Sequence, residues 1–112
     1  MPESARLVTA EELEKFPDDD YRYELVEGRV IRMSPVGWEH GRLVMQFGTL
    51  LMACVQERQL GVVVTEVGFK LASNPDTVRG PDLAFVRQER IPATGLRGFW
   101  HGPPDLVVEV LS

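Results

Sequence analysis

Two carboxylates in this chain stand among apolar residues, where a soluble protein seldom leaves a charge. Glu109 lies within the run LVVEVL (106–111), and Glu24 lies within the alternating stretch 21–33. A buried charge costs several kcal/mol unless another group pairs with it or neutralises it. We therefore expect each of these side chains to have a partner, and the type of partner decides the chemistry.

The dipeptide Pro-Asp occurs in two similar settings that bring further carboxylates to apolar strands. Asp82 opens the run PDLAFV and Asp105 opens the run PDLVVEV, where a proline is tolerated at the start of a strand. Asp105 and Glu109 share a strand face, but four residues separate them by about 13 Å, which is too far for one metal ion. A carboxylate partner for Glu109 must come from another strand, and Asp82 is the best candidate, followed by Glu24.

Such a pair of carboxylates points to a divalent cation. Two carboxylates that meet without a positive group repel each other and raise each other's pKa. Mg²⁺ binds one or two carboxylates, keeps several waters and leaves positions open for phosphate oxygens. The chemistry that follows is metal-assisted phosphodiester hydrolysis, in which the ion polarises the phosphoryl oxygen and lowers the pKa of the attacking water.

Each of these residues also has a purely structural interpretation. Asp82 suits a turn before a strand, an arginine could pair with Glu109, and Glu24 could be a solvated hairpin residue. His40 could be a packed histidine near a helix end, or it could orient water or phosphate. The arginines cannot be ranked from the sequence.

Two helices are predicted around these residues. Thr9 followed by Glu12 has the pattern of a capping box and predicts a short helix over 10–16, before the acidic loop 17–20. Helical periodicity within 37–61 predicts a long helix that stops near Gly61 and carries His40 on the N-terminal extension of its apolar stripe. The predicted core positions of this stripe are Leu43, Phe47, Leu50, Leu51 and Cys54.

The remaining segments predict strands. Alternation on both sides of Glu27-Gly28 predicts a hairpin that pairs Glu24 with Ile31. The stretches 62–72 and 78–87 predict two strands joined by the turn SNPDT, and a last strand from Asp105 is predicted to be buried on both faces. This order of elements favours an α+β sheet with at least one helix packed across it.

Composition narrows the function classes. The chain has 112 residues, enough for one domain, and no apolar run of membrane-spanning length. Its single cysteine excludes an intramolecular disulfide and a Cys-based zinc site, and favours a reducing cytoplasm. The net charge of −5 argues against a general nucleic-acid binder, although a nuclease concentrates acid at its metal. Because an apolar strand ends the chain without a covering element, we expect a longer parent domain.

Four segments in order resemble the Uma-type restriction-endonuclease family of the PD-(D/E)XK nuclease superfamily: YELVEGRVIRMSP, EHGRLVMQFGTLL, RGPDLAFV and PPDLVVEVLS. The likeness covers the chain from Thr9 onward. It implies a restriction-endonuclease-like fold, a mixed β-sheet flanked by helices, in a single domain over 1–112 truncated at its C-terminus. It also implies Mg²⁺, or Mn²⁺, as the cofactor.

The resemblance assigns roles to four residues. Asp82 matches the aspartate of the PD element and Glu109 the acidic residue of the (D/E)XK element, so that both would bind the metal. Glu24 matches an N-terminal acidic position and would hold a second ion or a metal-bound water. His40 matches a helix-start histidine that would line the site.

One position departs from the pattern. The simple (D/E)XK motif places a lysine two residues after Glu109, where this chain has Leu111. The family resemblance implies that the lysine lies on a following helix, beyond Ser112. The positive group that would orient the attacking water is thus missing from this chain.

The prediction is therefore a Mg²⁺-dependent DNA endonuclease, cytoplasmic, without a membrane partner and with a homodimer possible around the aromatic segment GFWHG. A non-catalytic interaction module that keeps the fold is the first alternative, favoured by the acidic charge and the absent lysine. The second is a hydrolase with paired carboxylates, such as a glycosidase, in whose cleft Trp38 and Trp100 would form walls.

Overall fold

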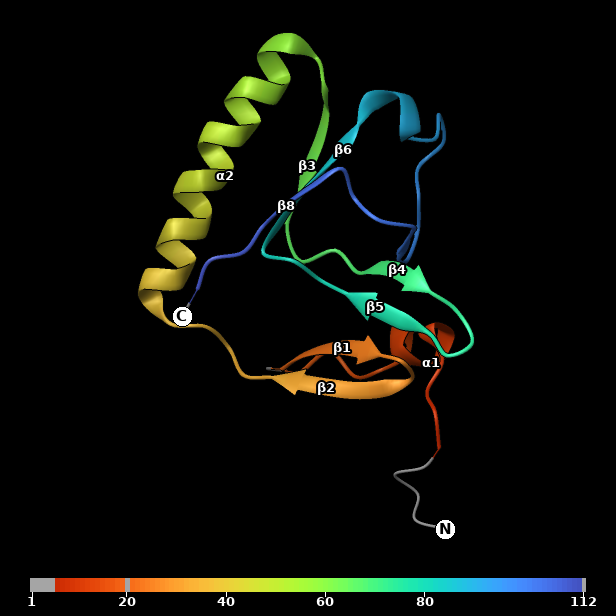
Figure 1. Ribbon diagram of the computed structural model, residues 1–112. Helices are drawn as coiled ribbons and strands as arrows, with labels where there is room; N and C mark the ends of the chain where they lie inside the picture. The colour runs from red at the N-terminus through yellow and green to blue at the C-terminus, as the bar shows by residue number, and fades with distance from the viewer. Residues whose placement is uncertain (1–5, 20, 112) are drawn as a thin grey trace. The chain divides into compact units, whose positions relative to one another are not determined.

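The structure is a computed structural model that describes residues 6–19 and 21–111 (Figure 1). The chain divides into two compact units, and neither is continuous in sequence. The first is drawn from 1–35, 68–80 and 98–103, and the second from 36–67, 81–97 and 104–112. Asp20, at the end of the predicted acidic loop, lies outside the described residues. The single domain over 1–112 stays a prediction.

The first unit contains a mixed five-stranded sheet in the order β2-β1-β5-β4-β7 and a short helix, α1 (Ala10–Glu14). Neighbouring strands are antiparallel except β4 and β7, which are parallel. The strands are β1 (Arg22–Val26), β2 (Arg29–Met33), β4 (Phe69–Ala72), β5 (Thr77–Arg79) and β7 (Trp100–His101). Its core includes Ala10, Leu13, Leu25 and Val78.

Local sequence signals in the first unit are confirmed. Thr9 and Glu12 form a capping box, in which each side chain accepts a hydrogen bond from the backbone of the other. The β1–β2 hairpin has the predicted register, with Glu24 opposite Ile31. Glu27 and Gly28 both have positive φ, 49° and 80°, as a two-residue hairpin turn requires.

The second unit contains the long helix α2 (Trp38–Arg58) and a three-stranded antiparallel sheet in the order β3-β6-β8 (Figure 1). The strands are β3 (Gly61–Val64), β6 (Leu83–Arg87) and β8 (Leu106–Val108), and the short 3₁₀ helix η2 (Gln88–Arg90) follows β6. No helix in the described part of the chain is long and apolar enough to cross a membrane.

Each of the two long predicted strands is broken into two. The stretch 62–72 contributes to β3 and β4, and 78–87 contributes to β5 and β6, so that each feeds both sheets. Glu66 in left-handed conformation (φ 56°) interrupts the first stretch, and Pro81, which lacks an N–H, interrupts the second. The predicted turn between them is confirmed by the antiparallel pairing of β4 with β5.

The predicted apolar stripe of α2 is confirmed in part, since Leu43 and Leu51 are half-buried, but its other three positions are wrong. Phe47, Leu50 and Cys54 are exposed, whereas Gly48 and Val55 are the buried residues of the helix. The reason is close packing at Gly48, where an added Cβ would lie 3.3 Å from a methyl carbon of Leu83 in β6. The stripe that faces inward therefore consists of His40, Val44, Gly48, Leu51 and Val55, all buried or half-buried.

Two end positions also differ from prediction. The helix ends at Arg58, with Gln59 in left-handed conformation, and Gly61 already begins β3. The strand β8 is not buried on both faces, since Leu106 and Val107 are exposed. Among the described residues β8 pairs on one side only, with β6, so that it forms an edge of the sheet.

Candidate functional site

Asp82 lies between Pro81 and the first residue of β6 in the second unit. Its side chain is only 5% exposed, and its Oδ2 accepts a hydrogen bond of 2.8 Å from the backbone N–H of Val110. The β6–β8 ladder pairs Leu83 with Val108, and one further step along it sets Asp82 opposite Glu109. Residues directly opposite in such a ladder share a face, with Cβ atoms about 5 Å apart. This register favours a common face for the two predicted metal ligands.

Glu109 itself lies one residue beyond β8 and is exposed. The sequence placed it inside a strand that is buried on both faces, and this placement is wrong for the reason given for β8. Because Val110 donates to Asp82, the peptide group that joins Glu109 to Val110 is held against the buried carboxylate. The side chain of Glu109 is exposed, but the backbone that carries it is fixed beside Asp82.

His40 contacts the other oxygen of Asp82. It is the third residue of α2, on the inward stripe, and its Nε2 lies 3.1 Å from Asp82 Oδ1. The imidazole is 10% exposed. The spacing to Val44 and Gly48, four and eight residues later, points the side chain toward the sheet. The second unit therefore brings the side chains of His40 and Asp82 into contact, and it holds the backbone next to Glu109 beside them.

Asp105, the aspartate of the other Pro-Asp dipeptide, has a different environment. Its Oδ2 accepts hydrogen bonds from the backbone N–H of Arg87, at 2.8 Å, and from Arg90 Nη1, at 2.9 Å. The backbone N–H of Arg87, followed by the hydrogen bond and charge of Arg90, holds the pKa of Asp105 below its usual value of 3.8. An arginine therefore accompanies the carboxylate of Asp105, whereas a histidine accompanies that of Asp82.

The residues around Asp82 fit a cation that keeps most of its waters. A carboxylate oxygen has two lone pairs, so it can accept a hydrogen bond and bind a cation at the same time. Within 6–19 and 21–111, no group of three or more His, Cys, Asp or Glu side chains is arranged to hold a metal ion. Mg²⁺ needs only one or two carboxylates, whereas a structural zinc site needs four protein ligands. Carboxylate oxygens such as those of Asp82 and Glu109 are the type of ligand that Mg²⁺ and Mn²⁺ bind.

Glu24 lies in the first unit and is engaged by an arginine that the sequence could not rank. Its Oε1 lies 2.7 Å from Arg79 Nε, and its Oε2 accepts a hydrogen bond of 2.7 Å from the backbone N–H of Gly80. The pairing of Leu25 with Val78 explains this contact, because the next step along the ladder sets Glu24 opposite Arg79. The role of Glu24 toward a second ion stays a prediction.

Comparison with known protein families identifies the family of this chain from its sequence. Residues 10–112 match the model of the Uma2 family, described as "Putative restriction endonuclease". The chain belongs to the Uma2 family. This confirms the family resemblance of the four sequence segments. No curated protein matches the chain.

A solved structure shares the fold of this Uma2 protein. It is described as "a putative nuclease belonging to DUF820" from Anabaena variabilis, and the two superpose with a TM-score of 0.77 at 21% sequence identity. The match covers 94% of this chain and 59% of that chain. The predicted nuclease-like α+β fold with a mixed sheet is thereby confirmed, and the chain spans about three-fifths of that neighbour.

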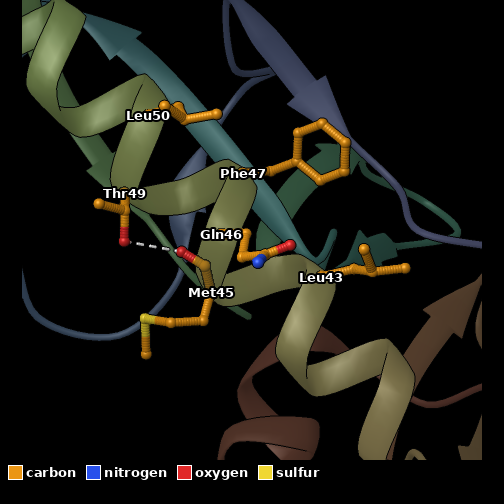
Figure 2. Close-up of a pocket in the computed structure, with 6 residues that line it drawn as sticks. All are labelled: Leu43, Met45, Gln46, Phe47, Thr49 and Leu50. Carbon is orange, nitrogen blue, oxygen red and sulfur yellow. Dashed lines mark hydrogen bonds between the residues drawn. The ribbon is translucent and has the colours of Figure 1, made fainter.

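A groove on α2 of the Uma2 protein lies apart from the predicted site residues. It has a volume of about 590 Å³, and Figure 2 shows Leu43, Phe47 and Leu50 pointing to one side of the helix there. Its lining is completed by Met45, Gln46 and Thr49, whose hydroxyl donates to the Met45 carbonyl. Because no titratable side chain lines this groove, it offers no general acid or base.

The two tryptophans have separate environments. Trp38 is largely exposed at the start of α2, and Trp100 packs against Phe69 in the first unit, with ring centroids 6.5 Å apart. A sugar-binding cleft needs aromatic walls on either side of a carboxylate pair. The large exposure of Trp38 does not favour its role as such a wall.

Proposed function

We propose that this Uma2 protein is a metal-dependent nuclease that hydrolyses phosphodiester bonds in DNA, with Asp82 and Glu109 as ligands of Mg²⁺ or Mn²⁺. The observation that carries the proposal is the hydrogen bond from the Val110 N–H to Asp82, in a register that sets Asp82 opposite Glu109. Membership in a family described as "Putative restriction endonuclease" supports the same reaction class.

The chain's own residues have distinct tasks in this proposal. Burial and two contacts hold the Asp82 carboxylate in one orientation, and exposed Glu109 faces solvent and substrate. His40 restricts Asp82 by contacting Oδ1, and so acts as a positioning residue. The bound ion would polarise the phosphate and lower the pKa of the attacking water. In the reaction the water oxygen would bond to phosphorus as one P–O ester bond breaks, and a proton from the water would pass to the leaving oxygen, giving a phosphomonoester and a hydroxyl.

Metal binding is the first test. Isothermal titration with Mg²⁺ and with Mn²⁺ should show binding by the wild type that is lost in Asp82→Asn and in Glu109→Gln, which keep the side-chain shape. Asp105→Asn is the matched control, because it makes the same change in the other Pro-Asp dipeptide, whose carboxylate an arginine accompanies. Binding that is equal in all four proteins would remove the metal assignment.

Plasmid nicking tests the reaction itself. With the full-length protein, we expect nicking that needs a divalent ion, is retained in Asp105→Asn and is lost in Asp82→Asn and Glu109→Gln. DNA binding without metal-dependent nicking would instead support the alternative of an inactive interaction module. We further propose a cytoplasmic location, because the chain has a single cysteine. A homodimer stays a prediction.

A further inference from the structure

The ion pair between Glu24 and Arg79 is unlike a typical surface pair. The Glu24 side chain is 9% exposed and both of its oxygens are engaged, one by Arg79 Nε and the other by the Gly80 N–H. Arg79 in contrast is 51% exposed. A buried carboxylate held by backbone therefore contacts the Nε atom of a half-exposed arginine side chain.

The pair Glu39–Arg42 on α2 provides the contrast. Arg42 Nε and Nη2 both bond to Glu39, and both side chains are exposed, as in most helix surface pairs three residues apart. Such pairs contribute little, because ordering two long side chains offsets the attraction. Glu24 has no such freedom, since strand β1 and the Gly80 N–H fix it. Arg79 therefore contacts a carboxylate that is already fixed, whereas Arg42 contacts an exposed one.

An arginine in such a contact suits a phosphate. Arginine has five N–H donors in a planar fork, and the contact with Glu24 uses the Nε edge. The terminal nitrogens can then donate two parallel hydrogen bonds to phosphate oxygens, which is the geometry for which arginine is preferred over lysine. Anchoring reduces the side-chain entropy that binding would otherwise cost.

We propose that Arg79, held by Glu24, binds a phosphate of the nucleic-acid backbone. This inference rests on the proposed function and names a contact that positions the substrate. Arg79 lies three residues before Asp82 in the chain. The chain has a net charge of −5 and only twelve lysine and arginine residues. Because few positive side chains are available to contact phosphates, the loss of one such contact should weaken DNA binding measurably.

The test uses a double substitution that leaves the net charge unchanged. Glu24→Gln with Arg79→Gln removes the buried carboxylate together with its cation, so that no unpaired charge stays behind. Glu39→Gln with Arg42→Gln is the matched control on the exposed pair. Binding to a fluorescein-labelled DNA duplex is followed by anisotropy in EDTA, over salt concentrations of about 50 to 200 mM. Circular dichroism checks that each protein is folded.

We expect the Glu24/Arg79 variant to bind about tenfold more weakly at the lowest salt, with a slope of log affinity against log salt reduced by about 0.9. The Glu39/Arg42 variant should match the wild type. Arg79→Lys should keep the slope, because the charge stays, but lose part of the affinity with the fork. This single variant also covers the case in which the double variant fails to fold.

The outcomes separate this inference from the proposed function. If both Arg79 variants bind DNA like the wild type while metal-dependent nicking is intact, the inference alone is overturned. If the expected loss occurs in a protein that neither binds metal nor nicks DNA, the Arg79 contact is supported and the nuclease is not. A wild type that does not bind DNA in EDTA overturns the Arg79 contact, and the nicking assay then decides the nuclease separately.

Discussion

The two Pro-Asp dipeptides place their aspartates at opposite ends of one strand pair. Asp82 precedes β6 and accepts from the amide of Val110, after β8, whereas Asp105 precedes β8 and accepts from the amide of Arg87, at the end of β6. Each aspartate thus accepts a hydrogen bond from the opposite strand, but they differ in their neighbouring side chain and in burial, with 5% of the Asp82 side chain and 25% of the Asp105 side chain exposed. From the sequence, the two aspartates could be distinguished only by their distance from Glu109. Their different partners, His40 and Arg90, could not be predicted because these residues come from other elements.

Asp105 predicts an acid-dependent loss of stability. Its pKa is lowered in the folded state, so the unfolded chain binds the proton more readily, and the contribution is present above the usual value of 3.8 and lost as pH falls below it. Asp105→Asn keeps an acceptor for the Arg87 N–H but cannot titrate.

Urea unfolding at about pH 7 and about pH 3 measures this effect. The free energy of unfolding should fall less between the two pH values in Asp105→Asn than in the wild type. Asp76, whose pKa the Ala10 N–H holds low, keeps its own acid dependence in both proteins, so the difference isolates Asp105. Identical losses in the two proteins would contradict the assignment.

At the scale of elements, signals that are local in the chain predicted structure well. The capping box at Thr9 and the turn at Glu27-Gly28 depend on residues within a few positions, and both form as expected. The packed face of α2 was not predictable in this way, because the helix carries two apolar stripes one residue apart. The contact of Gly48 with Leu83 decides which stripe faces inward, and Leu83 lies on strand β6, far from the helix in the sequence.

The glycines of α2 predict opposite responses to substitution. Gly41→Ala should stabilise the protein by about 0.5–1 kcal/mol, since nothing lies within 4 Å of the added Cβ and alanine favours the helix. Gly48→Val should destabilise it by about 1–3 kcal/mol, because its branched side chain would press on buried Leu83.

Denaturant unfolding of the two variants beside the wild type gives both values. A Gly48→Val protein as stable as the wild type would show that Leu83 does not pack against this helix position. A Gly41→Ala protein of unchanged stability would mean that the helix is already frayed at this turn.

At the scale of the whole molecule, the missed features are those that depend on distant pairing. The β1–β5 pairing that joins Glu24 to Arg79 connects residues 55 positions apart, and no local sequence signal near either residue predicts it. The splitting of two predicted strands between two sheets has the same origin. The acidic residues could be selected from their apolar surroundings, but their partners could not.

The interleaving of the two units predicts that they unfold together. The chain passes between them at 35/36, 67/68, 80/81, 97/98 and 103/104, so neither unit can unfold without releasing the strand ends of the other. Native-state hydrogen exchange in increasing denaturant should give one opening free energy for the slowest amides of both units. Leu25, in the first unit, and Ala84, in the second, are suitable probes because both are buried in strands. Two separate free energies that stay distinct up to the unfolding transition would show that each unit opens by itself, and would leave the Asp82 and Arg79 contacts on independently stable parts.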